Sequence, residues 1–460
     1  MKRLEKLYDG NMRKKYLLFT IPLILSALLS QSYNFINSMM IGKFIGSEAF
    51  AATAVTAELI ELLNSIFFGY LTGIGIYVSI LFGKNDYQKM LNVIKMNFLL
   101  SSAFAIIIAL ICNLFCNQIF DILNVNYEVY ENAEIYFRTY VLGYLVFQIN
   151  WGFTYISNGM SLTKIPLAAS VVTGVINVFL NFLFLSVFNK GIGYSALSTV
   201  ISATITTFVY ICIFIKLFKN MGVKCNGIKV NKEVFKNSIE YGAPSMFQQI
   251  TMYACTALVS PLTNTCATAA LSGYAIANKA RSLILAIYQN SSKANTNFVG
   301  QAMGAGKIKK IREGIKIGTT QGLLFFGLSI TFFMIFANEF TALFLDPIKD
   351  AESFTVSVNI IRFLFPFILF NVFNNLFHGI FRAVGSGKLM FVSTLIYAIS
   401  YVIYAYIFFA VLPYEIRIYG VHLAISGAYI TEMIFATFIF VTGRWKSPEY
   451  IKLEQACKDN

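Results

Sequence analysis

An internal repeat is the feature that most constrains how this chain of 460 residues can fold. Residues 136–164 align with residues 360–388 at an offset of 224 positions, which places Asn150 on Asn374. A second alignment of the two halves, at an offset of about 222 positions, places Pro22 on Pro244. Both halves are mostly apolar. Two homologous apolar halves are a common build for membrane transporters, with the substrate path between the halves.

The apolar content of the chain decides the class of protein. Hydrophobic residues make up 57% of the chain and charged residues 13%, which excludes an ordinary soluble domain. Twelve stretches reach the roughly 20 residues that a helix needs to cross a bilayer. They are 16–42, 49–82, 92–120, 131–157, 164–188, 192–218, 235–261, 268–303, 314–345, 353–381, 388–412 and 418–443. The alternating pattern of an outer-membrane barrel is absent. The sequence therefore predicts an all-α polytopic membrane protein with twelve transmembrane helices.

The repeat divides these spans into two pseudo-symmetric lobes of six helices around a central cleft. We expect an N-lobe at 1–219, a cytoplasmic connector at 220–234, a C-lobe at 235–443 and a cytoplasmic tail at 444–460. The chain has no phosphate-binding loop and no long extramembrane domain, so it is not expected to be an enzyme. Transport would draw on an ion gradient or run downhill. The seven cysteines lack metal-type spacing, and no metal site is expected.

The net charge of +14 is a topology signal rather than the mark of a nucleic-acid-binding protein. Of the 36 basic residues, 26 lie in the segments expected on one side of the membrane and four in those expected on the other. This asymmetry follows the positive-inside rule. It predicts a multi-pass protein of the cell membrane with both termini cytoplasmic.

Ionisable residues at membrane depth are costly, which makes them the first candidates for function. Glu58 and Glu61 share one face of the second span. The pair predicts a proton or cation site, and the alternative is that a basic neighbour such as Arg138 neutralises it. Arg138 and Arg362 are repeat mates, which favours an architectural role for both.

The eighth span carries the bases Lys279, Arg281 and Lys293. In the repeat register Glu58 lies opposite Lys279, so we expect at least one acid–base pair across or within the lobes. A structural salt bridge that closes one end of the cleft is the alternative to a substrate-binding role. Any base left over would meet substrate and favour zwitterions or anions over lipophilic cations.

Two further groups of polar residues lie within spans. His378 in the tenth span is either a satisfied interior histidine or a titrating one. Glu432 in the twelfth span is a weaker candidate, because nothing polar is expected to accompany it. The second group is neutral: it consists of Asn37, Asn177, Asn181 and Thr199 in the first lobe. These four side chains form either a site or hydrogen bonds that join helices.

Several segments resemble the multidrug and toxic compound extrusion (MATE) family of the MOP flippase superfamily. Residues 22–52 read PLILSALLSQSYNFINSMMIGKFIGSEAFAA and look like the family's first-span signature. Residues 177–202, 273–283, 297–307 (NFVGQAMGAGK) and 381–388 (FRAVGSGK) match in the expected order. The resemblance covers nearly the whole chain. It implies twelve helices in two lobes, a V-shaped cleft, rocker-type alternating access, and efflux of organic molecules in exchange for sodium ions or protons.

The chain departs from that family at four positions. Asn37 and Asn181 stand where relatives often have aspartates, and Gln249 and Asn371 lie near places where many relatives have carboxylates. An amide neither titrates nor carries charge for a cation. The usual coupling site is therefore in question, and Glu58 and Glu61 are the expected replacements.

The leading interpretation is a secondary-active multidrug or metabolite exporter, a cation- or proton-coupled antiporter. The alternative is a lipid-linked oligosaccharide flippase or exporter of the same superfamily, which the bases of the eighth span keep open. A membrane receptor without transport would leave the repeat unexplained. Coupling is assigned to Glu58, Glu61 and the four neutral residues of the first lobe. The substrate cleft is assigned to Gln249, Lys279, Arg281, Lys293, Asn371 and His378. The expected partners are a small organic substrate and the lipid bilayer, with no cofactor beyond Na⁺ or H⁺ as coupling ion, and the chain is expected to be a monomer.

Overall fold

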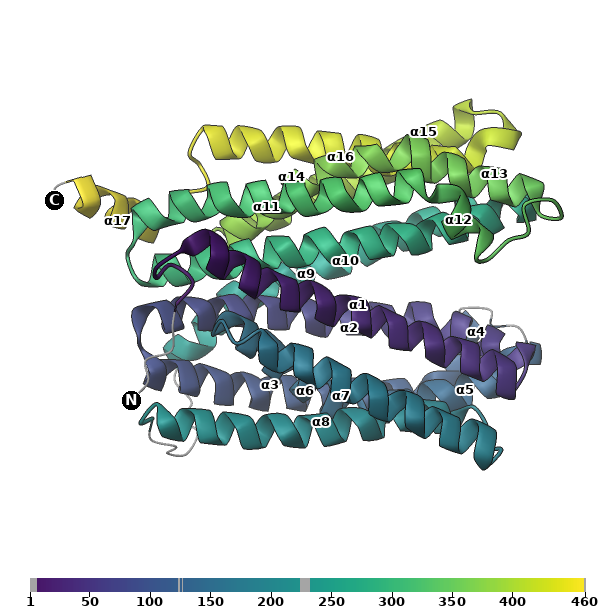
Figure 1. Ribbon diagram of the computed structural model, residues 1–460, viewed down its shortest axis with the longest axis horizontal. Coiled ribbons are helices and arrows are strands. Elements are labelled where there is room, and N and C mark those ends of the chain that lie inside the picture. Colours follow the sequence, from purple (N-terminus) through teal and green to yellow (C-terminus); the bar gives the residue numbers. More distant parts are fainter. Residues whose placement is uncertain (1–5, 123–124, 126, 224–231, 459–460) are drawn as a thin grey trace. The chain divides into compact units, whose positions relative to one another are not determined.

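The structure, a computed structural model, describes residues 6–122, 125, 127–223 and 232–458, and within them every regular element is helical (Figure 1). The first half contains α1 (Met12–Phe44), α2 (Ser47–Lys84), α3 (Tyr87–Leu114), α4 (Cys116–Ile122), α5 (Tyr127–Leu142), α6 (Tyr144–Gly159), α7 (Lys164–Asn181), the π-helix η1 (Phe182–Val187) and α8 (Gly193–Asn220). The second half contains α9 (Lys232–Thr263), α10 (Thr268–Gly304), α11 (Ile308–Ile335), α12 (Ala337–Ala342), α13 (Ala351–Asn359), η2 (Ile360–Leu364), η3 (Phe365–Phe367), α14 (Ile368–Ala383), α15 (Gly387–Val411), η4 (Tyr414–Ile416), α16 (Arg417–Val441) and α17 (Pro448–Lys458).

The prediction of an all-α polytopic membrane fold is confirmed. Each expected span is occupied by one long helix or by helical pieces in series, such as α13, η2, η3 and α14. Among the described residues, nine helical segments are long and apolar enough to cross a bilayer. The expected spans at 131–157, 235–261 and 268–303 are not among the nine. The first is divided into two helices of 16 residues each, and α9 and α10 carry more polar side chains.

The fourth and tenth spans are both interrupted, at nearly equivalent positions of the repeat. Gly143 separates α5 from α6, and a Cβ atom at this position would lie 2.6 Å from Val200 Cγ2 of α8. Glycine therefore permits the close approach of α8. In the second half, Pro366 lies in the short 3₁₀ turn η3. Proline has no backbone N–H to donate to the preceding turn, so the regular α-helical hydrogen bonding is interrupted there.

The described chain forms two compact units whose boundaries lie inside helices. Unit 1 comprises Met1–Lys6 and Leu25–Gly242, and unit 2 comprises Leu7–Ile24 and Ala243–Asn460. The expected lobes divide the chain between helices, whereas the units divide α1 after Ile24 and α9 after Gly242. Pro22 and Pro244, the repeat-related prolines, lie within two residues of these divisions. A proline inside a helix removes one backbone hydrogen bond and makes the helix easier to bend at that point.

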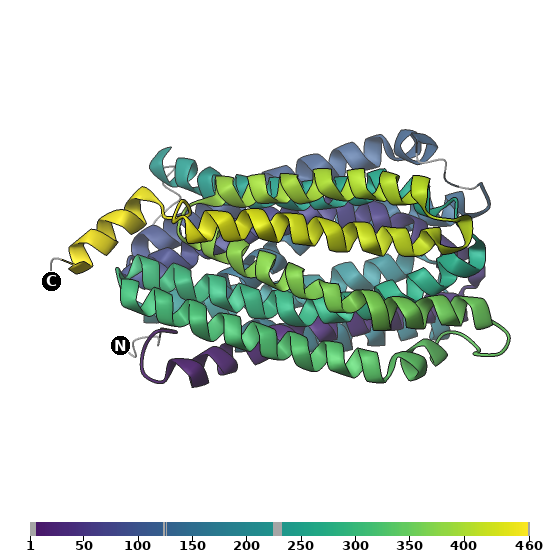
Figure 2. The ribbon, with the colours of Figure 1, turned by 90° about the horizontal axis from the view of Figure 1, so that it is seen from above.

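Each unit has its own apolar core. In unit 1 one cluster gathers around Phe67, Phe137 and Tyr144, and a second one gathers around Tyr77 and Phe153. In unit 2 one large cluster joins α10, α13, α14, α15 and α16. Helices α15 and α16 lie side by side along most of their lengths in both views (Figures 1 and 2).

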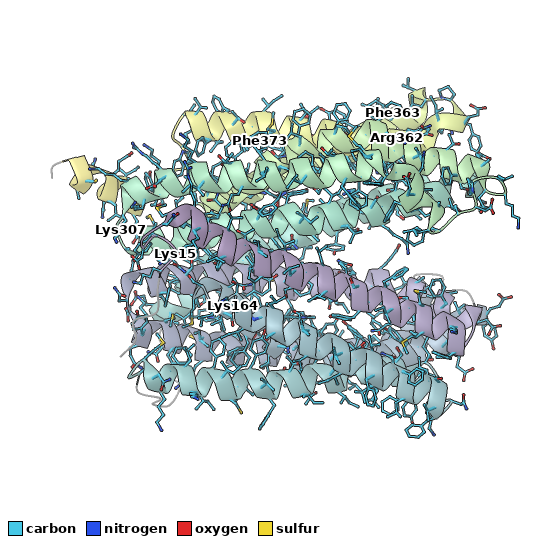
Figure 3. All side chains as sticks on the ribbon, in the orientation of Figure 1. Lys15, Lys164, Lys307, Arg362, Phe363 and Phe373 are labelled. Carbon is cyan, nitrogen blue, oxygen red and sulfur yellow. The ribbon has the colours of Figure 1, made fainter. Side chains whose placement is uncertain are left out.

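The two ends of unit 2 differ in the residues they carry. Lys15 and Lys307 lie at one end of its long helices, and Arg362 and Phe363 lie toward the opposite end (Figure 3). The start of α1 and the turn between α10 and α11 are therefore on the same side of any membrane that this unit spans.

Candidate coupling and substrate sites

The four neutral residues of the first lobe meet in unit 1. Asn181 donates Nδ2–H to Asn37 Oδ1 at 3.2 Å, to Asn177 Oδ1 at 3.3 Å and to the Asn177 carbonyl at 3.1 Å. Asn177 in turn donates to Thr199 Oγ1 at 3.1 Å. Three helices, α1, α7 and α8, thus converge on one polar cluster. The i, i+4 spacing on α7 places both of its asparagines on the face that meets α1 and α8.

This amide cluster is buried and incompletely satisfied. Asn177 and Asn181 have no exposed surface, and Asn181 Oδ1 has no hydrogen-bond partner. An unmet buried acceptor costs about 1–3 kcal/mol. Amide and hydroxyl oxygens are ligands that hard cations accept, but this cluster supplies no negative charge of its own.

The two acids of the second span lie outside the amide cluster. Glu58 and Glu61 are on the exposed face of α2, whereas Thr56 and Ile60 on its other face are buried. Glu61 interacts electrostatically with Tyr33 and Tyr140. Both side chains are exposed, and neither of them contributes to the amide cluster.

Arg138 is tied to the end of unit 1 where α3, α4 and α5 meet. Its Nε lies 2.7 Å from Glu134 Oε1, and its guanidinium donates to the Asn113 carbonyl and to Asn117 Oδ1. These contacts join α3, α4 and α5, and the ion pair of Arg138 is with Glu134 rather than with the acids of α2.

The predicted cleft residues of unit 2 are distributed along α9, α10 and α14. Asn371 donates to Tyr288 Oη at 2.6 Å, and Lys279 Nζ lies 5.2 Å from the centre of the Phe344 ring. Lys293 and Gln249 are half-buried. Since Lys279 and Lys293 are 14 residues apart on α10, about 21 Å of helix separates them, and one small substrate cannot contact both.

Arg281 lies in an aromatic part of unit 2. It interacts electrostatically with Tyr274, Tyr397, Tyr401 and Tyr429, and its Nε is buried without a hydrogen-bond partner. The only polar contact of its guanidinium that reaches hydrogen-bond range in the described chain is to Asn278 Oδ1, at 3.5 Å. This guanidinium retains donor capacity for an anionic group.

His378 and Glu432 form a polar network that the sequence did not predict. His378 Nε2 lies 3.0 Å from Glu432 Oε1, and this nitrogen makes no hydrogen bond within the described residues. Asn374 donates to Glu432 Oε2 at 2.8 Å, and Ser393 lies 3.4 Å from Oε1. The expectation that nothing polar accompanies Glu432 is therefore wrong. Its partners come from α14 and α15, and the one visible signal was the i, i+4 pair of Asn374 and His378 on one helix face.

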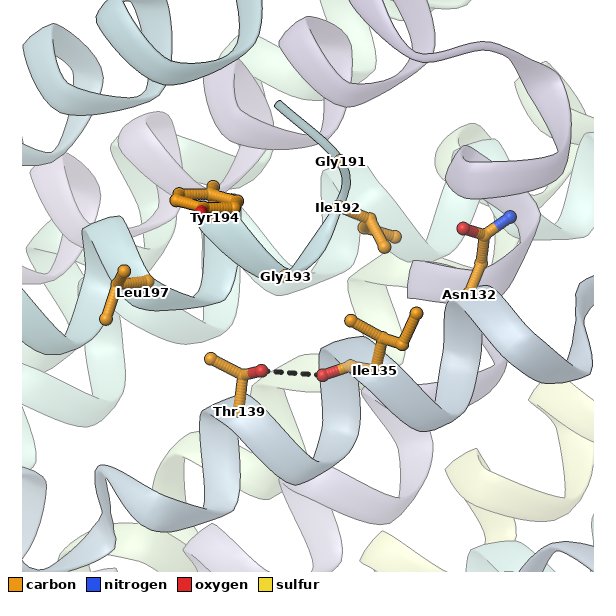
Figure 4. A pocket seen from close by; sticks show the side chains of 8 residues that line it. All are labelled: Asn132, Ile135, Thr139, Gly191, Ile192, Gly193, Tyr194 and Leu197. Atoms are coloured by element: carbon orange, nitrogen blue, oxygen red, sulfur yellow. Dashed lines mark hydrogen bonds between the residues drawn. The ribbon is translucent and has the colours of Figure 1, made fainter. Parts of the chain in front are cut away.

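A pocket of about 410 Å³ lies in unit 1 between α5 and the turn that begins α8 (Figure 4). Its lining combines Asn132, Ile135 and Thr139 with the segment 191–194 and Leu197. Thr139 donates to the carbonyl of its own helix neighbour Ile135. The lining contains none of the candidate site residues and no charged side chain.

The repeat, the twelve helical spans and the buried polar clusters define a multi-pass membrane protein with internal duplication. The MatE family model matches residues 22–183 and 244–407, one match in each half of the chain. The chain belongs to the MatE family, and the family is one of transporters.

Similar proteins extend over almost the whole chain. The probable multidrug resistance protein YpnP of Bacillus subtilis is 25% identical over 450 residues, which cover 96% of this chain and 98% of YpnP. The multidrug export protein MepA of Staphylococcus haemolyticus is 22% identical over 385 residues, which cover 83% of each protein.

Solved structures share the fold at low identity. An outward-facing multidrug resistance MATE family transporter superposes with a TM-score of 0.88 at 19% identity, over 99% of this chain and 98% of that one. A MOP superfamily transporter from Pyrococcus furiosus superposes with a TM-score of 0.86 at 20% identity, over 96% of this chain and 97% of that one. The latter is described as having a binding pocket of reversed polarity that suggests a different function.

Proposed function

We propose that this protein is a secondary-active exporter of small organic molecules that works by alternating access, with a proton or sodium gradient as its energy source. The observation that carries the proposal is the match of the transporter family model to both repeats. The names of YpnP and MepA, a probable multidrug resistance protein and a multidrug export protein, support efflux as the direction.

Coupling is proposed for unit 1, at Glu58 and Glu61. They replace the charge that the amide cluster of Asn37, Asn177 and Asn181 lacks. Two carboxylates one helical turn apart hold one proton more tightly than either would alone, or release it when a cation binds. The amide cluster would then order water or lend oxygen ligands without carrying the charge itself.

The substrate class proposed is zwitterionic or anionic, and the observation behind it is Arg281. A partly buried guanidinium with unmet donor capacity attracts a carboxylate or phosphate and repels a lipophilic cation. The same observation supports the second candidate function, export of an anionic lipid-linked oligosaccharide. The transporter from Pyrococcus furiosus, whose binding pocket is described as having reversed polarity that suggests a different function, is a precedent for variation of pocket polarity within this fold.

Purified protein in liposomes with imposed sodium or proton gradients tests the proposal. We expect a gradient-dependent flux of at least one compound from a panel of cationic, zwitterionic and anionic dyes. Scrambling of a labelled anionic lipid without flux of any dye would favour the second candidate. Absence of any flux under every gradient would contradict transport.

The orientation proposed is that of both termini in the cytoplasm, with the chain a monomer in the cell membrane. Single cysteines placed at Asn189, between η1 and α8, and at Lys309, at the start of α11, test it in a cysteine-free background. An impermeant thiol reagent should label only the cysteine at position 189 in intact cells. Labelling at position 309 alone would reverse the orientation.

A further inference from the structure

The strongest unassigned feature is the carboxylate of Glu432, which is buried inside unit 2. It is 3% exposed, and His378 beside it is 6% exposed. A buried charge at membrane depth is expensive unless it is well paired. Glu432 receives one hydrogen bond from Asn374 at 2.8 Å and a longer one from Ser393 at 3.4 Å, and His378 Nε2 lies 3.0 Å from its Oε1.

The repeat provides an internal comparison for this site. Asn150 and Thr154 of α6 are the repeat mates of Asn374 and His378 on α14. In unit 1 these positions bond to α8 through neutral groups: Asn150 donates to Thr207 Oγ1 at 3.3 Å, and the hydroxyls of Thr154 and Tyr210 lie 3.0 Å apart. The fold thus joins the equivalent helices without a titratable pair. An ionisable pair in unit 2 is therefore more than the packing requires.

Hydrogen bonding settles which group of the pair takes up a proton. Arg382 donates to Gln248 Oε1 at 2.6 Å, so the amide nitrogen of Gln248 is the atom that meets His378 Nδ1 at 2.9 Å. That nitrogen is a donor, which makes Nδ1 an acceptor and leaves the proton of the neutral imidazole on Nε2, beside Glu432. A second proton on the ring would break the bond from Gln248. An added proton therefore goes to the carboxylate.

The charged and titratable groups around Glu432 come from each helix packed against α14 and α16. From α10, Tyr288 interacts electrostatically with Glu432, and Arg281 does so with Tyr429 of α16. Cys255 of α9 interacts with Glu432, and Tyr397 of α15 interacts with Cys255 and Arg281. On α14 itself Arg382 is connected through Gln248. The titratable residues of α11 all lie in its first nine residues, and Arg362 lies in η2, toward the other end of unit 2 (Figure 3).

We propose that Glu432 is a proton-binding group of the transport cycle, with His378 as the residue that positions and stabilises its ionised form. The proposal rests on the proposed exporter function and adds a site in unit 2 to the groups proposed in unit 1. In each cycle the carboxylate takes one proton from the acidic side, which removes its charge. It returns that proton to the other side when the substrate is exchanged.

Proton binding is measured directly on the purified protein by infrared difference spectroscopy. We expect a protonated-carboxyl C=O band that grows as the pH is lowered. The band should be missing in Glu432→Gln. A parent spectrum without such a band, or an unchanged band in Glu432→Gln, overturns the proposal whatever the transport results are.

Transport in liposomes gives the functional half of the test, with the zwitterionic dye rhodamine B as the probe. In Glu432→Gln the flux driven by a pH gradient should fall about tenfold or more, because an amide side chain does not bind and release a proton. It should keep probe–probe exchange, which moves no net proton. The matched control is Thr154→Val, which removes the equivalent helix–helix contact of unit 1 without a titratable group, and it should keep both fluxes. Equal loss of both fluxes in Glu432→Gln identifies a structural role and overturns the proposal.

A positioning role for His378 has its own signature. His378→Leu removes a donor beside the carboxylate, which disfavours the ionised form. The pH midpoint of gradient-driven flux should therefore move to higher pH, and Asn374→Leu should move it in the same direction. An unmoved midpoint in both variants overturns that role. Probe flux in the parent that sodium drives and a pH gradient does not would overturn the proposal and leave the exporter function standing. Absence of all parent flux would instead contradict the exporter function.

Discussion

Replacing Asn181 by aspartate tests how the amide cluster of unit 1 is held together. Asn181 Nδ2 points at three acceptor oxygens at 3.1–3.3 Å. In Asn181→Asp an oxygen takes the place of that donor, so three attractive contacts become contacts between lone pairs. The loss of a neutral hydrogen bond costs about 1 kcal/mol, and the unmet acceptor costs about 1–3 kcal/mol more.

The expected result is a loss of about 2–4 kcal/mol of unfolding free energy in sodium-free buffer at neutral pH. For a unit of about 220 residues this corresponds to a fall in Tm of roughly 5–15 °C. The new carboxylate also supplies the charge that the cluster lacks, with Asn37, Asn177 and Thr199 as further oxygen ligands. Sodium at about 100 times its Kd for the new site should then return about 2.7 kcal/mol beyond any shift that sodium causes in the parent. Lower pH should also restore stability, because a protonated carboxyl regains one donor.

Thermal unfolding of purified protein in sodium chloride and in choline chloride at equal ionic strength measures these shifts. Asn97→Asp is the matched control. Asn97 is also buried in unit 1, but the Tyr70 hydroxyl donates to its Oδ1, and this hydroxyl can still donate to a carboxylate. We expect a smaller loss there and no response to sodium beyond that of the parent. If Asn181→Asp is as stable as the parent without sodium, or if sodium shifts parent and variant equally, the reasoning about the amide cluster fails.

Three further predictions concern other parts of the chain. Of Glu58→Gln and Glu61→Gln, at least one should abolish gradient-driven export while expression is retained, and parental flux in both would remove α2 from the coupling site. Gly273→Ala should destabilise unit 2 by about 1–3 kcal/mol in thermal unfolding, because its Cβ would lie 2.3 Å from the Ser353 carbonyl oxygen. Gly327→Ala on α11, where a Cβ meets nothing within 4 Å, should be neutral or gain up to about 1 kcal/mol. Hydrogen bonds from Lys446 and Arg312 hold the pKa of Glu454 below its ordinary value of 4.5, so the docking of α17 should persist above that pH and be lost as the pH falls through the lowered pKa. Limited proteolysis of the tail across this range measures the loss, and a cleavage rate independent of pH would contradict it.

The membrane class and the repeat could be read from the sequence because both are properties of contiguous segments. A stretch of about 20 apolar residues requires a helix in lipid wherever it lies in the chain. The i, i+4 spacing of Asn177 and Asn181 likewise predicts a shared helix face. The resemblance to the family placed Asn37 and Thr199 in the same pocket as these two asparagines. Hydrogen bonds in the structure connect all four side chains.

The network around Glu432 depends on tertiary packing alone. Its partners Ser393, Asn374 and His378 are 39, 58 and 54 residues away in the chain, and no local pattern connects α14, α15 and α16 at that depth. The same holds for the division of α1 after Ile24 and of α9 after Gly242, since hydropathy reads each as a single helix. Hydrophobic length specifies which segments cross the membrane. Which polar side chains face one another is decided only when the helices pack, because each helix could present any of its faces to any neighbour.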